Sequence, residues 1–167
     1  DVPPPPGSQE WKVPESAGMA SPTMVTDGHR AYAIFANGDL AAFDFEGKKV
    51  WAKNLGLPDN QYGHTASLSL WRNRLIVQMD QGVPEENKAR LFAFDSATGQ
   101  LIWEKQRPVG SSWASPIIAE AAGKTQILTL AVPWTIAYDA KDGSELWRLG
   151  EIGGEITPSP IYSAGLL

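Results

Sequence analysis

One short phrase recurs three times along the chain and constrains the fold more than any other feature. Its clearest copy is FDSATGQLIW at residues 94–103, and further copies lie at 43–51, one residue shorter, and at 138–147. Each copy reads as an aromatic residue that ends a strand, an Asp-to-Gly turn, and a short strand that closes on Trp. Asp can accept hydrogen bonds from backbone amides two residues on, and Gly tolerates the positive φ that such a turn needs. A phrase repeated in this way predicts a repeat architecture.

The period of the repeat predicts the kind of unit. The Asp of the phrase stands at positions 44, 95 and 139, which are 51 and 44 residues apart. A second recurring element, Ala-Ser-Pro or a variant of it, has its serine at positions 21, 67, 115 and 159, with separations of 46, 48 and 44. Periods of about 40–50 residues are typical of β-propeller blades, each built from four antiparallel strands.

Each unit shows four short strand patterns joined by tight turns, without a helical stripe. In the first unit Asn37-Gly38 is a strong two-residue hairpin signal. In the second unit the equivalent turn is replaced by a polar loop at 80–90, either a solvated loop or one that carries function. The predicted fold is an all-β partial propeller, with a Pro-rich extended arm at 1–10 and a propeller segment at 11–167. Three blades are predicted near 20–55, 66–107 and 114–150. Residues 7–11 are predicted to be the last strand of a preceding unit, and a fourth blade begins at 157 with its first strand at 161–163.

Composition excludes several functions. The net charge is −5 and no stretch combines basic residues with aromatics, so a nucleic-acid partner is not expected. The chain has no cysteine, which removes disulfides, thiolate metal sites and Cys nucleophiles. No apolar run reaches the roughly 18 residues of a membrane span.

The phrase with its flanking alanine, Ala-x-Asp-x-x-Thr-Gly-x-x-x-Trp at residues 93–103, resembles the PQQ-type β-propeller repeat. The resemblance covers about residues 7–163. It implies that Trp51, Trp103 and Trp147 dock between adjacent blades.

The resemblance leaves two classes of function. Quinoprotein dehydrogenases of this family bind pyrroloquinoline quinone (PQQ) and Ca²⁺ in a large propeller and oxidise alcohols or sugars. Others resemble the lipoprotein BamB, which binds no quinone and acts as a protein-interaction scaffold. The alcohol dehydrogenases use an adjacent-cysteine disulfide against the quinone, which this chain cannot form, and none of their catalytic or Ca²⁺-binding residues can be mapped onto it. The sequence therefore favours the BamB-like class, without a cofactor and, from the resemblance alone, in the periplasm or another exported compartment.

The repeated polar and glycine residues are predicted to be structural. An identical place in every unit favours turn capping over catalysis or metal binding. The predicted blade-docking and turn residues are Asp44, Asp95, Asp139, Gly47, Gly99, Gly143 and the three tryptophans of the phrase.

Four residues without a repeated role are candidates for a channel-facing or partner-binding surface. Tyr62 and His64 precede the second unit, and Trp113 precedes the third, where the loops of a propeller gather near its axis. His64 could face a pocket or be a hydrogen-bonded loop histidine. Trp134 at the Pro133-Trp134 tip could contact a partner or fold back onto its blade. No catalytic triad, phosphate loop or metal motif accompanies these residues.

Three blades and one strand cannot close a ring, since propellers generally need about four to eight blades. We expect an exposed sheet face at each end, covered by further blades of a longer propeller, by a second copy of the chain, or by a different protein. The predicted function is a non-enzymatic scaffold for protein–protein interaction. The alternative is a segment of a PQQ- and Ca²⁺-dependent oxidoreductase whose active site lies mostly in other blades.

Overall fold

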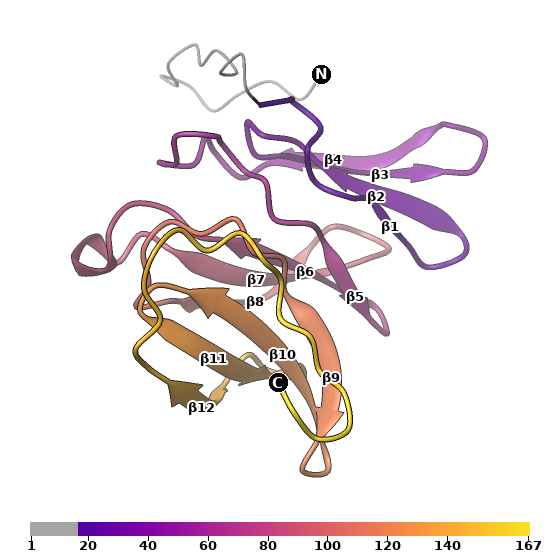
Figure 1. Cartoon of the computed structure of the whole chain (residues 1–167). Coiled ribbons are helices and arrows are strands. Elements are labelled where there is room, and N and C mark those ends of the chain that lie inside the picture. The colour runs from indigo at the N-terminus through magenta and orange to yellow at the C-terminus, as the bar shows by residue number, and fades with distance from the viewer. Residues whose placement is uncertain (1–16) are drawn as a thin grey trace.

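The computed structural model describes residues 17–167, and within that range the chain forms three four-stranded antiparallel sheets and no α-helix (Figure 1). The prediction of an all-β partial propeller is thereby confirmed. The Pro-rich arm and the strand predicted at 7–11 lie outside the described residues. No helix in residues 17–167 is long and apolar enough to cross a membrane.

Each sheet takes its four strands in chain order, so each is a meander. We call the sheets blade 1, blade 2 and blade 3. Blade 1 contains β1 (Val25–Thr26), β2 (Arg30–Ile34), β3 (Asp39–Asp44) and β4 (Lys49–Asn54). Blade 2 contains β5 (Ser69–Trp71), β6 (Arg74–Met79), β7 (Arg90–Asp95) and β8 (Leu101–Gln106), with a 3-10 turn, η1 (Pro84–Glu86), between β6 and β7. Blade 3 contains β9 (Ile117–Ala121), β10 (Lys124–Ala131), β11 (Trp134–Asp139) and β12 (Glu145–Leu149).

The blades fan out from their first strands. Strand β5 contacts both β1 and β9, so the first strands of the three blades lie closest to the axis of the fan (Figure 1). Because every blade is a meander, the β1–β2 and β3–β4 turns and their equivalents share one side of the fan, here called the turn side. The β2–β3 turn, its equivalents and the connections between blades share the opposite side, the loop side.

The same irregularity occurs in each blade. The pairing between the third and fourth strands shifts register at Ala42/Phe43, at Ala93/Phe94 and at Ala137/Tyr138. A register shift of this kind bends a strand and increases its local twist. It falls directly before the Asp-to-Gly turn in all three blades.

The apolar core lies between the blades. Tyr32, Leu40 and Ala42 of blade 1 pack with Leu75 and Phe94 of blade 2. A second cluster joins the other face of blade 2 to blade 3, and its larger members are Ile76, Leu91, Val109, Ile127, Ile136 and Tyr138. Blade 2 is covered on both faces, which explains why β6 is buried at every position from Leu75 to Met79.

Two tryptophans of the repeated phrase, Trp51 and Trp103, contact the blade that follows their own. The Trp51 indole donates a hydrogen bond to the carbonyl oxygen of Ser96 at 2.9 Å. The ring lies so close to Gly99 that a Cβ added there would be 2.7 Å from Trp51 Cδ2, and Trp103 lies equally close over Gly143. Trp147 is the third copy, and it remains 38% exposed.

The serines of the repeated opening form a second connection between blades. Ser67 Oγ accepts a hydrogen bond from the amide of Thr23 at 2.9 Å. The amide of Ser67 donates to Ser115 Oγ at 2.8 Å, and the amide of Ser115 donates to Ser159 Oγ at 3.1 Å. The Ala-Ser-Pro openings therefore bond successive units together on the inner side of the fan.

The fourth unit begins differently from the prediction. Residues 161–163 form no strand, and Ser163 makes only an isolated bridge with Leu166 across a turn at Ala164-Gly165. A first strand needs a second strand to pair with, and the described chain supplies none here. Tyr162 packs instead against the outer face of blade 3, beside Leu128.

Candidate functional site

The loop side is where the three blades differ from one another, and its loops are hydrogen-bonded into one surface. The β6–β7 loop lies between two connections: the Gly82 amide donates to the carbonyl oxygen of Asp59 at 2.8 Å, and the Ser111 amide donates to that of Gly82 at 2.9 Å. The Trp113 amide donates to the carbonyl oxygen of Ile156 at 3.0 Å. Backbone bonds of this kind fix the relative positions of the loops.

Tyr62 and Trp113, which the sequence places in separate connections, lie together at this surface. The Trp113 indole donates to Asn60 Oδ1 at 2.9 Å, and the Tyr62 amide donates to the same oxygen at 3.2 Å. The two rings meet edge to face with centroids 5.7 Å apart. Asn60 holds both aromatics in place, and its role was not predicted from the sequence.

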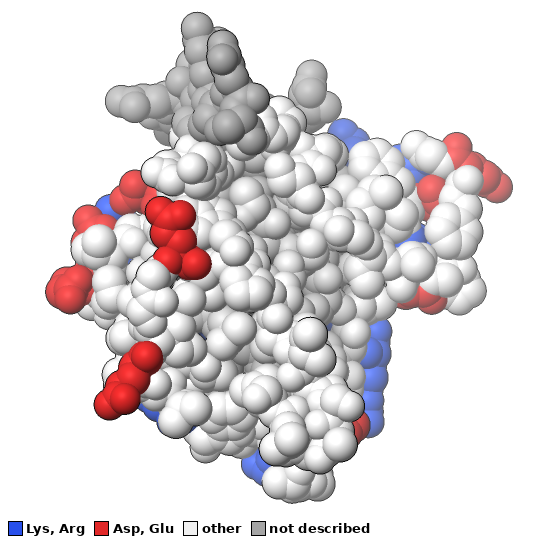
Figure 2. All heavy atoms as spheres, viewed as in Figure 1, with Lys and Arg blue, Asp and Glu red and all other residues white. Residues whose placement is uncertain are grey.

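Two hollows open on either side of Trp113. The acidic hollow, about 370 Å³, is lined by the carboxylates of Asp59, Glu86 and Glu155 and by Trp113. The neutral hollow, about 400 Å³, is lined by the Tyr62 and Trp113 rings and by small uncharged residues. Figure 2 shows acidic side chains on the side of the molecule where these loops project, and a second group on the opposite side, at the projecting end of blade 1.

His64 does not reach either hollow. Its side chain is 4% exposed, and its Nε2 lies 2.9 Å from the carbonyl oxygen of Ala66, where the protonated nitrogen donates a hydrogen bond. Burial lowers the pKa of His64 to about 4, because the interior disfavours the imidazolium form. Of the two predicted environments, the structure gives His64 that of a hydrogen-bonded loop histidine.

Trp134 folds back onto its own blade. A Cβ added at Gly150 would lie 2.6 Å from the Trp134 ring, and the Arg148 guanidinium lies over that ring at 5.4 Å from its centroid. The side chain is half-buried at the start of β11. Among the four residues singled out in the sequence, Tyr62 and Trp113 therefore form the open aromatic surface, whereas His64 and Trp134 support the loops.

A buried ion pair between blades 2 and 3 was not predicted. Arg107 is 0% exposed and donates through Nε to Asp80 Oδ1 at 2.7 Å and through Nη2 to Oδ2 at 3.2 Å. It also donates to Thr129 Oγ1 at 2.7 Å, and Gln78 Nε2 donates to Asp80 Oδ2 at 2.7 Å. Burial raises the pKa of the Asp80 carboxyl, and the adjacent guanidinium opposes that shift. The pair holds the start of the polar loop at 80–90 against the connection to blade 3.

The turn carboxylates occupy structural positions. Asp95 Oδ1 accepts hydrogen bonds from the amides of Ala97 and Thr98 at 3.1 and 2.9 Å, and Asp44 and Asp139 accept the equivalent bonds in their own turns. The glycines three or four residues later, Gly47, Gly99 and Gly143, all have positive φ. Within residues 17–167 no group of three or more His, Cys, Asp or Glu side chains is placed to hold a metal ion.

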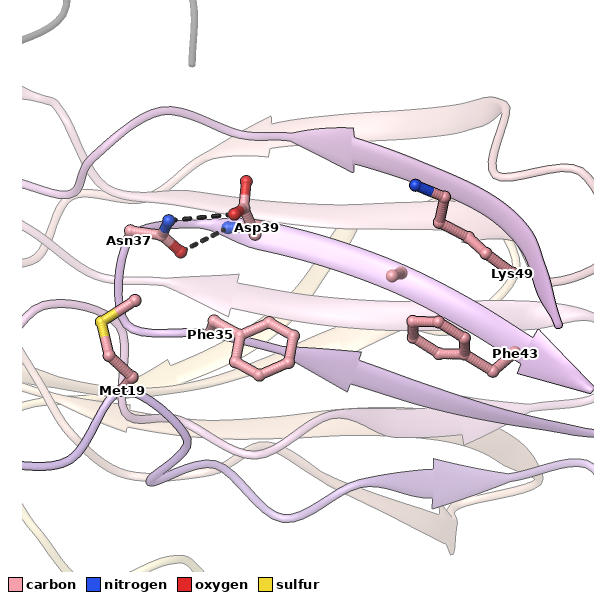
Figure 3. Close-up of a pocket in the computed structure, with 7 residues that line it drawn as sticks. Met19, Phe35, Asn37, Asp39, Phe43 and Lys49 are labelled. Carbon is pink, nitrogen blue, oxygen red and sulfur yellow. Dashed lines mark hydrogen bonds between the residues drawn. The ribbon is translucent and has the colours of Figure 1, made fainter. Parts of the chain in front are cut away.

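A third hollow, about 360 Å³, lies on the face of blade 1 that points away from blade 2 (Figure 3). Met19, Phe35 and Phe43 supply its apolar lining, and Asn37 donates to Asp39 Oδ2 at 2.9 Å at its edge. Phe43 holds the position that Phe94 and Tyr138 hold in the other blades, where the ring is buried against the preceding blade. This hollow is therefore a blade face, equivalent to the two faces that are covered.

The comparisons with known proteins agree with this geometry at the level of the fold. No protein-family model matches the sequence, and no curated protein matches it. Solved structures do match. BamB from Moraxella catarrhalis is 21% identical with a TM-score of 0.58, over 78% of this chain and 36% of BamB. A quinohemoprotein alcohol dehydrogenase from Comamonas testosteroni is 20% identical with a TM-score of 0.60, over 83% of this chain and 23% of the enzyme. A europium-containing methanol dehydrogenase is 14% identical with a TM-score of 0.58, over 78% of this chain and 24% of the enzyme.

These neighbours confirm the resemblance drawn from the repeated phrase, and the chain has the fold of a PQQ-type β-propeller segment. It spans about a quarter to a third of the length of the proteins it matches. The TM-scores to BamB and to the dehydrogenases, 0.58 and 0.60, do not separate the two groups.

Proposed function

We propose that this chain is part of a β-propeller that serves as a non-enzymatic scaffold for protein–protein interaction. The observation that carries the proposal is that the buried titratable groups of the loop side, His64 and Asp80, are bonded within the protein, while an aromatic pair remains open. His64 is buried and bonded to a backbone carbonyl, and Asp80 is bonded to Arg107, so both groups hold loops in place. The side chains that remain open are the Tyr62–Trp113 pair and the acidic residues around it. Aromatic residues on a rigid, partly concave surface are favoured at protein interfaces.

The open faces of the outer blades support the same proposal. On blade 1 the hollow lined by Phe35 and Phe43 is uncovered, and on blade 3 Trp147 is 38% exposed. Apolar surface of this kind is normally covered by further protein. The proposed propeller therefore continues beyond the three described blades. From the family resemblance we infer an exported compartment.

The second candidate is a segment of a PQQ-dependent oxidoreductase, and the structural similarity to a quinohemoprotein alcohol dehydrogenase favours it. On this alternative, quinone and Ca²⁺ would be bound largely by other blades. The residues described here would then form part of the propeller wall.

Two measurements on the full-length protein test the proposal. The protein is purified, incubated with PQQ and Ca²⁺, and assayed for quinone absorbance and dye-linked alcohol oxidation. We expect no bound quinone and no oxidation. Retained quinone with alcohol oxidation would refute the scaffold role and support the second candidate. In parallel, a photocrosslinking amino acid at Val83, which is 53% exposed on the loop side, is expected to trap a protein partner, whereas the same group at Glu46 on the turn side is expected to trap none.

A further inference from the structure

We propose that the loop-side groove, formed by the acidic hollow, the neutral hollow and Trp113 between them, binds an extended basic segment of a partner protein. This inference rests on the proposed scaffold function and names the partner chemistry that the site would accept. It follows from the anchoring of Trp113, the charge of one hollow and the size of the other.

Trp113 is a fixed wall and not a mobile side chain. Its indole nitrogen, its backbone amide and its ring edge are all engaged, by Asn60, Ile156 and Tyr62 respectively. The remaining surface of the ring borders both hollows. An aromatic ring that is already ordered loses little side-chain entropy on binding, which is typical of residues that dominate an interface.

The charge around the groove is strongly one-sided. Apart from the buried Asp80–Arg107 pair, the loop-side segments 55–68, 80–89, 107–116 and 150–160 carry five carboxylates and one lysine. That lysine, Lys88, is bonded to Asp59 at 2.6 Å and to Glu86 at 3.0 Å. Glu155 lines the same hollow, is exposed, and forms no ion pair within residues 17–167.

A Lys or Arg side chain suits the acidic hollow for two reasons. Its cation can bond Glu155 at the rim, and it can lie against the face of the Trp113 ring, whose quadrupole attracts a cation. The hollow is about 370 Å³, large enough for one long side chain. A like-charged or purely apolar group would leave the Glu155 carboxylate without compensation, whereas Asp59 and Glu86 already share Lys88.

The neutral hollow suits the next part of the same segment. Ala17, Gly18 and Ser21 line it together with Thr65, Thr157 and the Tyr62 ring, so its walls are uncharged and mostly small. A small side chain and the backbone of an extended peptide can lie against such walls without a charge being buried. The two hollows separated by one ring therefore fit an extended chain with a basic residue followed or preceded by a small one.

The test uses the full-length protein and a display library of unstructured seven-residue peptides. We expect enrichment of peptides that contain Lys or Arg next to a small residue. A synthetic copy of an enriched peptide, labelled with a fluorophore, is then titrated by fluorescence anisotropy at two salt concentrations. The affinity is expected to fall as salt rises.

Three variants decide whether the groove is the site. Trp113→Ala should weaken binding by about 30-fold or more, since removal of an interface hot spot costs about 2 kcal/mol or more. Glu155→Gln should weaken it by about 2- to 5-fold, the range of an exposed ion pair, and Glu155→Lys by more. Glu46→Gln on the turn side is the matched control and should leave the affinity unchanged. Glu155 is exposed, so its variants keep the test valid even if Trp113→Ala unfolds the protein.

Each outcome separates this inference from the scaffold role. Enriched peptides without basic residues, no enrichment at all, or binding insensitive to both Glu155 variants would overturn the basic-segment inference. A partner crosslinked through Val83 in the same preparation would show that the scaffold role stands without it. Bound quinone with alcohol oxidation would refute the scaffold role itself.

Discussion

Replacement of Gly99 by alanine should destabilise the fold for two reasons, a clash with the ring of Trp51 and backbone strain at a positive φ. A matched glycine elsewhere in the chain separates these two contributions. The new Cβ would lie 2.7 Å from Trp51 Cδ2 and 2.8 Å from Cε3. Both ring atoms belong to a side chain held by its bond to Ser96, so the ring can move only by losing that bond. Overpacking of this kind costs about 1–3 kcal/mol. The positive φ of Gly99, 70°, adds about 1–2 kcal/mol for a residue with a Cβ. We therefore expect a total loss of about 2–5 kcal/mol.

Gly123→Ala is the control for the backbone contribution. Gly123 has φ 73°, nearly that of Gly99, and no atom of the described chain lies within 4 Å of the position that a Cβ would take there. Its alanine variant should therefore lose only about 1–2 kcal/mol. Urea unfolding followed by far-UV circular dichroism measures both losses on one scale.

A double-mutant cycle completes the experiment. Trp51→Ala alone should cost about 3–5 kcal/mol, since a large aromatic contact and one hydrogen bond are lost. In that background Gly99→Ala should cost no more than Gly123→Ala, because the ring it would strike is gone. Equal losses for Gly99→Ala and Gly123→Ala in the wild-type background would refute the close Trp–Gly contact as the connection between blades.

Three further outcomes follow from the site and from the blade ends. The pKa of His64 is lowered from 6.5 to about 4, so between these pH values the unfolded chain binds a proton at this residue and the folded chain does not. The free energy of unfolding should therefore fall by about 3 kcal/mol as the pH drops from 6.5 to 4. Urea titrations across this range should show that His64→Gln removes this fall. Asp80→Asn should lower the free energy of unfolding by about 3–5 kcal/mol, because Arg107 is left buried without its counter-charge. The double variant Asp80→Leu, Arg107→Met should lose less stability, because it leaves no buried charge unpaired, and thermal unfolding of the two proteins compares these losses. Trp147→Ala should destabilise the protein less than Trp51→Ala does, by a margin of at least 1 kcal/mol in the free energy of unfolding, because Trp147 is 38% exposed in the described chain. Equal losses for the two variants would contradict the absence of a covering blade over Trp147 in residues 17–167.

The repeating half of the molecule could be predicted from the sequence because its causes are local. The Asp-to-Gly turns, the Asn37-Gly38 hairpin and the strand pattern depend on residues within a few positions of each other. Each observed blade has the four short strands that the pattern predicts, and β3 at Asp39–Asp44 begins directly after the Asn37-Gly38 turn. The strand predicted at 161–163 is absent because a strand also requires a partner, and that requirement is not visible in a local pattern.

The candidate site could be predicted only in part, because its contacts join residues far apart in the chain. Tyr62 and Trp113 stand out as unrepeated aromatics beside the connections between blades. Their meeting through Asn60 depends on the fan angle between blades 1, 2 and 3, and a single Asn in a loop gives no signal of it. The same holds for Asp80 and Arg107, which read as ordinary loop charges and yet form a buried pair 27 residues apart.

The division between repeated and unrepeated residues also divides the molecule by role. On the turn side every blade repeats the Asp and Gly of the turn and the Trp that follows, although the exposed residues between Asp and Gly differ from blade to blade. On the loop side the equivalent positions hold a two-residue turn in blade 1, the polar loop at 80–90 in blade 2 and Pro133-Trp134 in blade 3. A partner that recognises this chain, and not any propeller of the same repeat, must read residues that the repeat does not fix. Trp113, Asn60 and Glu155 are such residues, and they lie around one groove. Under the proposed scaffold function, specific recognition would therefore depend on the loop side, and turn-side substitutions would change the stability of the fold with little effect on partner choice.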